Sequence, residues 1–477
     1  MKKSPLKVFF IILVLSFFSL RCTTNPVSGQ KEIILLSEKD EIKLAKEWYP
    51  NILWSAEGAG GEFKDDKLKA YLRDLVLQIH RVSHRPHLPI EFVIQNSSLP
   101  NAWAIPGYVA ITRGLLCALE SEAEFVYVMG HEIGHISARH SASQMSKSIL
   151  ADSLLKVGSY ALSGKSYADW AMALGSIGAN LLLLKYSRED ELEADRLGVE
   201  YMVRLGYDPK NAIYAHLNVQ RASDEYLRRV GKDSEEGSFF SELLSTHPRT
   251  KIRIEELKTI TEKVKPVNLR GDGTQRKIFQ EAISNLKRTH RIYITYYDPA
   301  VSALRKGNIK EAERLIDRAL EEKNDEAPYL TLKGILEQKR GRHLSAEGYF
   351  RRAQKIDPSY VPALRGLGIV CYEKKDLRNA MAFLKDALSL FPNDVPSHYY
   401  LGMAYFDSHN YHYAINHLEF ALQALPEHPT IYGTLGICYE KTGKIHKAYE
   451  YYLKQVKVAP DNEMGRYAKD RLRSIQR

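Results

Sequence analysis

Apolar residues recur at helical spacing along most of the chain, which predicts a mostly helical protein. Ser37-Glu38-Lys39-Asp40 is a typical helix start, and a second helix is expected over Lys64–Val82. The range Leu88–Ile94 is expected to form a strand, because prolines precede its core and polar residues follow it. Asn101–Thr112 is predicted to be extended and to bend at Pro106-Gly107.

From about residue 298 the pattern repeats itself. Glycines recur 34 residues apart, at 334, 368, 402 and 436, and alanines and prolines keep the same period. This is the signature of tetratricopeptide repeats, in which small residues stand where paired helices approach each other closely. Such repeats stack into an α-solenoid with a concave groove. We therefore expect this part of the chain to bind an extended segment or a helix of another protein.

The amino terminus is predicted to be an export signal. Three lysines precede an apolar run, Val8–Leu20, which is too short to span a bilayer but suits the core of a signal peptide. The run resembles a bacterial lipoprotein signal over residues 1–21, with Cys22 as the lipidated residue. Arg21 departs from that pattern, so an ordinary signal peptide and an uncleaved anchor are the alternatives. The expected location is the periplasmic side of the bacterial cell envelope, with a lipid anchor in the outer membrane.

The charge pattern argues against a nucleic-acid partner, and the cysteine spacing argues against a cysteine metal site. The formal net charge of the 477 residues is +10, but the basic residues are spread over segments of mixed sign. Nucleic-acid binding requires a concentrated basic patch, so no nucleic-acid partner is expected. Cys117, Cys371 and Cys438 have no metal-like spacing and are expected to be buried thiols.

The strongest chemical signal is His131-Glu132-Ile133-Gly134-His135, an H-E-x-x-H motif within a helical pattern. Histidines four residues apart on a helix lie on one face and can hold one metal ion. Glu132 lies beside them, where it can deprotonate a water molecule on the metal. The motif also occurs by chance, so it does not establish a metal site by itself. A catalytic zinc site needs a third protein ligand besides the two histidines.

Two candidates for the third ligand follow the motif. His140 stands at the wrong spacing, since the extended metal-binding pattern needs histidine where the chain has Ser141. Glu191 and Asp195 lie four residues apart in a downstream helical segment. Glu191 can bind the metal, and Asp195 can orient a ligand histidine by accepting its hydrogen bond. Taken alone, this acidic segment would be a solvated helix face, but its apolar frame and the nearby H-E-x-x-H motif favour the metal site.

Together these motifs resemble the zinc metalloendopeptidase family that contains the HtpX-like and CAAX-prenyl proteases. The resemblance covers about residues 22–260 and implies a helical gluzincin fold with a small β-sheet. It further implies one Zn²⁺ held by His131, His135 and Glu191, with Glu132 as the general base. Pro106-Gly107-Tyr108 departs from the two glycines usual in the family. The matching motifs are Asn101-Ala102-Trp103-Ala104, Thr112-Arg113-Gly114-Leu115, the segment from His131 to His140, that from Ser187 to Asp195, and Thr246-His247-Pro248.

Other residues of these motifs have several interpretations. The strand around Asn101, Ala102, Trp103 and Ala104 can pair with the backbone of an extended substrate. His247 can donate to the oxyanion of the transition state, block the metal as a fourth ligand, or pack in a turn. Arg188 and Arg253 can orient groups of the site or form surface salt bridges.

The sequence therefore predicts a mainly α protein with four parts. These are a signal peptide (1–21), a zinc metallopeptidase domain (22–261), a linker with a helix (262–297) and a tetratricopeptide domain (298–477). The expected function is cleavage of unfolded or misassembled envelope proteins, while the repeats bind substrates or outer-membrane assembly proteins. The alternative is a chaperone or scaffold that acts through its repeats and carries a latent protease.

Overall fold

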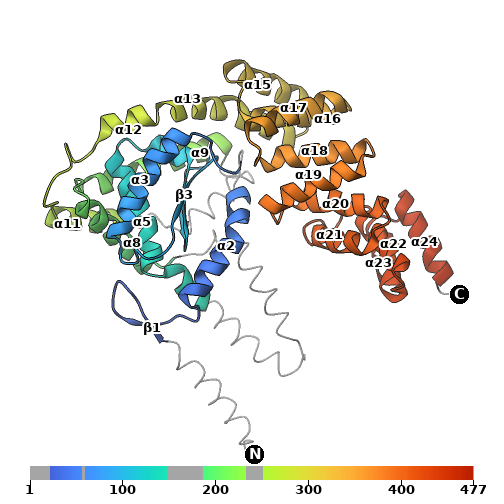
Figure 1. Cartoon of the computed structure of the whole chain (residues 1–477), viewed down its shortest axis with the longest axis horizontal. Coiled ribbons are helices and arrows are strands. Elements are labelled where there is room, and N and C mark those ends of the chain that lie inside the picture. The colour runs from blue at the N-terminus through green and yellow to red at the C-terminus, as the bar shows by residue number, and fades with distance from the viewer. Residues whose placement is uncertain (1–21, 56–59, 148–185, 232–250, 476–477) are drawn as a thin grey trace, which may run out of the picture. The chain divides into compact units, whose positions relative to one another are not determined.

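The computed structural model describes residues 22–55, 60–147, 186–231 and 251–475 (Figure 1). The predicted signal peptide and His247 lie outside these residues. The chain divides into two compact units, Met1–Arg291 and Ile292–Arg477. Both units are mainly helical, which confirms the predicted fold class. Among the described residues, no helix combines the length and the apolar character that crossing a membrane requires.

A three-stranded sheet lies at the centre of the first unit. Strand β3 (Glu91–Gln95) pairs in parallel with β5 (Tyr108–Thr112), and β5 pairs antiparallel with β4 (Ala102–Ile105). The strand order is β3-β5-β4, so β4 is an edge strand. Gly107 has a φ of +103°, which only glycine adopts without strain, and it allows the tight turn between β4 and β5. The extended segment bent at Pro106-Gly107 thus forms a hairpin.

Helices cover both faces of this sheet. Alternate strand residues pack against α3 (Asp66–Val82) and α5 (Glu122–Ser137) on one face and against α2 (Glu38–Ser55) on the other (Figure 1). Ala102 and Ala104 belong to the first face, whereas Trp103 belongs to the second. A second, two-stranded sheet joins β1 (Cys22–Thr24) and β2 (Lys31–Ile33).

Helix α5 packs on α8 (Arg188–Arg204) along an extended contact. Gly130 of α5 faces Gly198 of α8, and a Cβ atom on Gly130 would lie 3.2 Å from the Gly198 Cα. Ser121 caps the start of α5, and a capping box of Ser187 and Asp190 starts α8. The small residues at this contact therefore allow side chains of the two helices to meet.

Further helices complete the described part of the first unit. Phe279, Ile283 and Leu286 are fully buried in the core of the first unit, and they lie in helices within the range 262–297, where a linker with a helix was expected. The helices are α4 (Arg113–Ala118), α9 (Asn211–Val230), α11 (Lys251–Lys263), α12 (Arg276–Ala282) and α13 (Ser284–Ile292).

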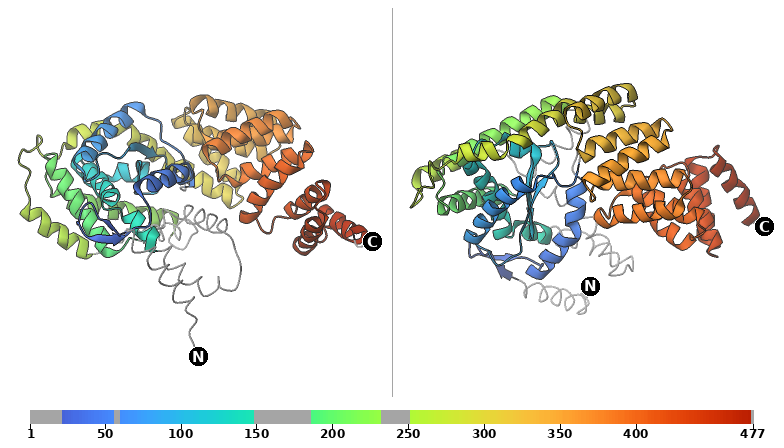
Figure 2. Two further views of the ribbon diagram at one scale, coloured as in Figure 1. Left: turned by 60° about the horizontal axis from the view of Figure 1, so that its bottom comes forward. Right: turned by 45° about the horizontal axis from the view of Figure 1, so that its top comes forward.

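The second unit is a stack of antiparallel helix pairs, coloured from yellow to red in Figure 2. The periodic glycines lie where paired helices touch, and Gly368 faces Leu384 as Gly402 faces Leu418. A π-helical turn, η2 (Tyr293–Tyr297), precedes the stack. The helices are α14 (Asp298–Arg305), α15 (Ile309–Glu322), α16 (Ala327–Lys339), α17 (His343–Ile356), α18 (Val361–Glu373), α19 (Leu377–Leu390), α20 (Val395–Asp407), α21 (Tyr411–Ala424), α22 (Ile431–Lys441), α23 (Ile445–Val458) and α24 (Glu463–Ile475).

Candidate metal centre

His131, His135 and Glu191 form a buried cluster between α5 and α8. The Nε2 atoms of the two histidines are 3.1 Å apart. Glu191 Oε2 lies 3.7 Å from His131 Nε2, and Glu191 Oε1 lies 3.4 Å from His135 Nε2. A tetrahedral zinc ion with bonds of about 2.0–2.2 Å needs ligand atoms about 3.4 Å apart, so this donor set fits that ion.

Asp195 fixes the tautomer of His131. Burial alone would raise the pKa of Asp195, but the charge and hydrogen bonds of Arg253 hold it well below its ordinary value, helped by His131 and His216. The ionised carboxylate only accepts hydrogen bonds, so His131 Nδ1 donates to Asp195 Oδ1 over 2.9 Å. The lone pair of His131 is therefore on Nε2, which faces the other ligands.

A different chain of contacts fixes the tautomer of His135. His140 Nε2 donates to Glu193 Oε2 over 3.0 Å, so His140 Nδ1 is an acceptor. That atom lies 2.9 Å from His135 Nδ1, which must then carry the hydrogen. His135 also presents the lone pair of Nε2 to the site. Burial lowers the pKa of His135 well below its ordinary value and keeps the ring neutral.

The charge of the site favours a cation. Glu132, Glu191 and Asp195 are all buried, with 5%, 1% and 0% of their surface exposed. Arg253 from α11 binds two of them, with Nη1 2.6 Å from Glu191 Oε2 and Nε 2.7 Å from Asp195 Oδ2. One guanidinium among three carboxyl groups leaves negative charge in a buried place, and a divalent cation can balance it.

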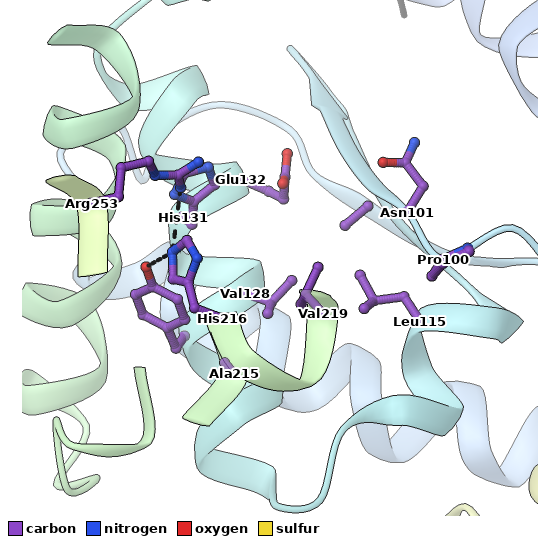
Figure 3. Close-up of a pocket in the computed structure, with 12 residues that line it drawn as sticks. Pro100, Asn101, Leu115, Val128, His131, Glu132, Ala215, His216, Val219 and Arg253 are labelled. Atoms are coloured by element: carbon purple, nitrogen blue, oxygen red, sulfur yellow. Dashed lines mark hydrogen bonds between the residues drawn. The ribbon is translucent and has the colours of Figure 1, made fainter. Parts of the chain in front are cut away.

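Glu132 faces a pocket beside the cluster (Figure 3). One side of the pocket is apolar, and the start of β4 forms another side with Asn101 and Ala102. A peptide bond held along this strand would lie close to both the cluster and Glu132. The pocket is lined by Pro100, Asn101, Ala102, Leu115, Tyr127, Val128, His131, Glu132, Ala215, His216, Val219 and Arg253.

The other residues expected at the site lie in several places. Trp103 is 5% exposed and packs under α2, where its indole N–H donates to Gln95 Oε1 over 3.0 Å. Ala104 is buried in the core on the other face of the sheet. Arg188 is exposed and pairs with its neighbour Glu189, whereas Arg253 is buried within the centre.

Three further residues at the centre carry no sequence motif. Tyr127 donates to Asp195 Oδ1 over 2.8 Å, and its position four residues before His131 places it on the same helix face. Tyr186 stacks on His135 with ring centroids 4.0 Å apart. His216 comes from α9 and lines the pocket. The four-residue spacing to His131 could have identified Tyr127 from the sequence. Tyr186 and His216 are single residues in separate segments, and no spacing connects them to the motif.

An H-E-x-x-H helix that meets a glutamate from a second helix defines a helical metallopeptidase site. In agreement with this class, residues 66–261 match the model of Peptidase family M48. Residues 297–361, 331–395 and 429–462 match tetratricopeptide repeat models. The chain thus carries an M48 metallopeptidase domain followed by tetratricopeptide repeats, as the resemblance in the sequence implied.

Two metalloproteases are similar to part of this chain. The chain is 31% identical to the mitochondrial metalloendopeptidase OMA1 of Arabidopsis thaliana over 172 residues, which are 36% of this chain and 31% of that protein. It is 24% identical to the beta-barrel assembly-enhancing protease of Escherichia coli K12 over 44% of this chain and 42% of that protein. The chain therefore spans less than half the length of these relatives. The solved tetratricopeptide protein YrrB is 20% identical over 40% of this chain and 97% of its own, with a TM-score of 0.31.

Proposed function

We propose that the protein is a zinc metalloendopeptidase that cleaves unfolded or misassembled proteins of the bacterial envelope. The observation that carries this proposal is the buried cluster of His131, His135 and Glu191, with Glu132 facing the adjoining pocket. Two ligand histidines with fixed tautomers and a glutamate are the donors that a catalytic zinc site needs. A scaffold without catalysis would not require this combination.

The residues of the site suit hydrolysis of a peptide bond. His131, His135 and Glu191 would hold the Zn²⁺, which would supply an acidified water molecule and polarise a carbonyl group. Glu132 takes the proton from the water and delivers it to the leaving amine. The edge strand β4, with Asn101 to Ala104, pairs with the substrate backbone, which favours extended chains over folded ones. Because Trp103 and Ala104 point into the core, this recognition uses their backbone and not their side chains.

His247 is proposed to stabilise the oxyanion of the transition state. Its place in Thr246-His247-Pro248 supports a role at the site, as the family resemblance implies. If it donates to the oxyanion, His247→Ala lowers turnover; if it instead occupies the metal, the same substitution raises turnover.

The proposed location is the periplasmic side of the outer membrane. The pattern of residues 1–21 supports export, and Cys22 supports a lipid anchor. The repeats are proposed to bind substrates or the proteins that assemble outer-membrane components. The name of the related beta-barrel assembly-enhancing proteases supports this role.

Zinc content and cleavage of unfolded casein by the full-length protein test the enzymatic proposal. The wild type is expected to hold about one zinc ion per chain and to cleave casein. Glu132→Gln is expected to retain the zinc and to lose activity by about 10²-fold or more, because general base catalysis contributes that much. Zinc without cleavage in the wild type would favour the chaperone or scaffold alternative, and full activity of Glu132→Gln would exclude the assigned base.

A further inference from the structure

His216 lies beside the candidate metal centre, but it is not one of the three proposed metal ligands. Its Nε2 lies 3.1 Å from the hydroxyl oxygen of Tyr127 and 3.5 Å from both Asp195 Oδ1 and Arg253 Nη2. The side chain is 10% exposed and lines the same pocket as Glu132. One end of the ring thus belongs to the network behind the metal ligands, and the ring also reaches the pocket.

The network determines which nitrogen of His216 carries the hydrogen. Tyr127 donates its hydroxyl hydrogen to Asp195 Oδ1 over 2.8 Å, because an ionised carboxylate only accepts. The Tyr127 oxygen can then only accept from His216. This contact of 3.1 Å is shorter than the 3.5 Å contact of the same Nε2 with Arg253 Nη2, which can only donate, so the hydrogen of the imidazole is on Nε2. Burial, above all, lowers the pKa of His216 and keeps the ring neutral. Nδ1 is therefore a hydrogen-bond acceptor.

This acceptor faces the pocket. In Figure 3 one ring nitrogen of His216 points to Arg253, and the other points to the side where Val128 and Val219 lie. Among the described residues, no group donates a hydrogen bond to His216 Nδ1. The rest of that wall is apolar and consists of Leu115, Val128, Ala215 and Val219.

We propose that this pocket is a specificity subsite for an uncharged substrate side chain with an apolar body and a terminal hydrogen-bond donor. The hydroxyl or carboxamide of that side chain donates to His216 Nδ1, and its body packs on Val128 and Val219. A purely apolar side chain would leave the acceptor buried without a partner, which disfavours it. A basic side chain would meet the charge of Arg253, and an ionised acidic one has no hydrogen to donate. The inference rests on the proposed protease function.

Matched peptides measure this preference directly. Fluorogenic peptides carry threonine or valine, asparagine or leucine, and tyrosine or phenylalanine, placed in turn on each side of the scissile bond. For the full-length wild type, kcat/KM is expected to be about 10-fold higher for the donor-bearing member at one of the two positions. In His216→Leu this ratio falls to about one. In His216→Gln the side-chain oxygen restores an acceptor, so part of the preference returns.

The controls separate this inference from loss of fold and from the proposed function. Each variant is checked for zinc content and thermal unfolding, and His446→Leu, at a side chain 93% exposed in α23, is the matched control. Equal ratios in the wild type, or a preference that persists in His216→Leu, would overturn the subsite. If zinc-loaded wild type cleaves no peptide, the protease proposal fails instead. The same pairs are then tested by fluorescence anisotropy on Glu132→Gln, where equal binding of both members would overturn the subsite.

Discussion

The two histidines proposed to bind the metal have different hydrogen-bond partners on their other ring nitrogen. His131 donates to the carboxylate of Asp195, whereas His135 donates to a second imidazole, His140, that is held by Glu193. Both arrangements put a lone pair on Nε2 of the histidine. The arrangement at His135 depends on two successive hydrogen bonds, from His135 to His140 and from His140 to Glu193. Such partners orient ligands and raise their basicity, so they affect metal affinity without touching the metal.

His140→Ala is expected to weaken zinc binding by about 10–100-fold, because His135 loses the acceptor that fixes its tautomer. Competition with a chromophoric chelator measures the zinc affinity. Glu193→Gln is expected to have a smaller effect, since an amide oxygen can still accept from His140. His87→Ala, at a side chain 61% exposed, is the control. An affinity in His140→Ala equal to that of the wild type would show that this chain does not orient His135.

At the scale of elements, close helix contacts depend on glycine in both units. In the repeats, Gly368 of α18 faces Leu384 of α19, and an added Cβ would lie 2.6 Å from the Leu384 Cγ. At Gly348 of α17, such a Cβ would meet no atom within 4 Å apart from its chain neighbours and the backbone of its own helix. The two glycines are both helical, so they differ in packing and not in backbone conformation.

Alanine at these two positions is expected to change stability in opposite directions. Gly348→Ala should raise the free energy of unfolding of the repeat unit by up to about 1 kcal/mol, because alanine favours the helix. Gly368→Ala should lower it by about 1–2 kcal/mol, because overpacking outweighs the same gain. Urea unfolding followed by circular dichroism compares them. A stabilised Gly368→Ala would mean that α18 and α19 can move apart freely.

The contact between α20 and α21 is expected to be sensitive to pH. His398 Nε2 donates to the Pro392 carbonyl over 2.8 Å, so its Nδ1 accepts from His417 Nδ1 over 2.9 Å. Burial, with the charges of His398 and Lys385, lowers the pKa of His417 to about 4. An unfolded histidine titrates near ~6.5, so between these values the unfolded chain binds more protons. Stability should therefore fall as the pH decreases from 6.5 to 4.

His417→Gln removes this titration while it keeps a donor for His398. The difference in unfolding free energy between pH 7 and pH 5 should be smaller in the variant by about 1 kcal/mol, a value reduced for partial solvent exposure. Chemical unfolding at the two pH values measures it. The same pH dependence in both proteins would mean that other groups cause the acid sensitivity of the repeat unit.

At the scale of the whole molecule, the proposed metal ligands all belong to the first unit. Removal of zinc should therefore lower the thermal transition of the peptidase unit and leave that of the repeats unchanged. Mass action gives a loss of about 4 kcal/mol when free zinc has been at 1,000 times its dissociation constant. Differential scanning calorimetry with and without a chelator tests this. A shift of both transitions by the same amount would mean that the two units unfold together.

Much of this protein is determined locally and follows from its sequence. The repeats are predictable because each 34-residue period forms one helix pair that packs on its neighbours, and the glycines mark the contacts. His131 and His135 are predictable because helical geometry alone places them on one face. Glu191 and Asp195 follow from their spacing and apolar frame, and the structure brings Glu191 to the two histidines.

Only the tertiary structure could decide which distant residues complete the centre. Arg253 and His216 come from separate helices, and no periodicity connects them to the H-E-x-x-H motif. From the sequence, Arg253 could equally form a surface salt bridge or orient groups of the site, because its burial depends on how the helices pack. Spacing along one helix is a local property of the chain, but contacts between helices depend on the shapes of all the surfaces that pack together. The sequence alone therefore determined the metal-ligand motif and the repeats, and the tertiary structure decided the network and the pocket around them.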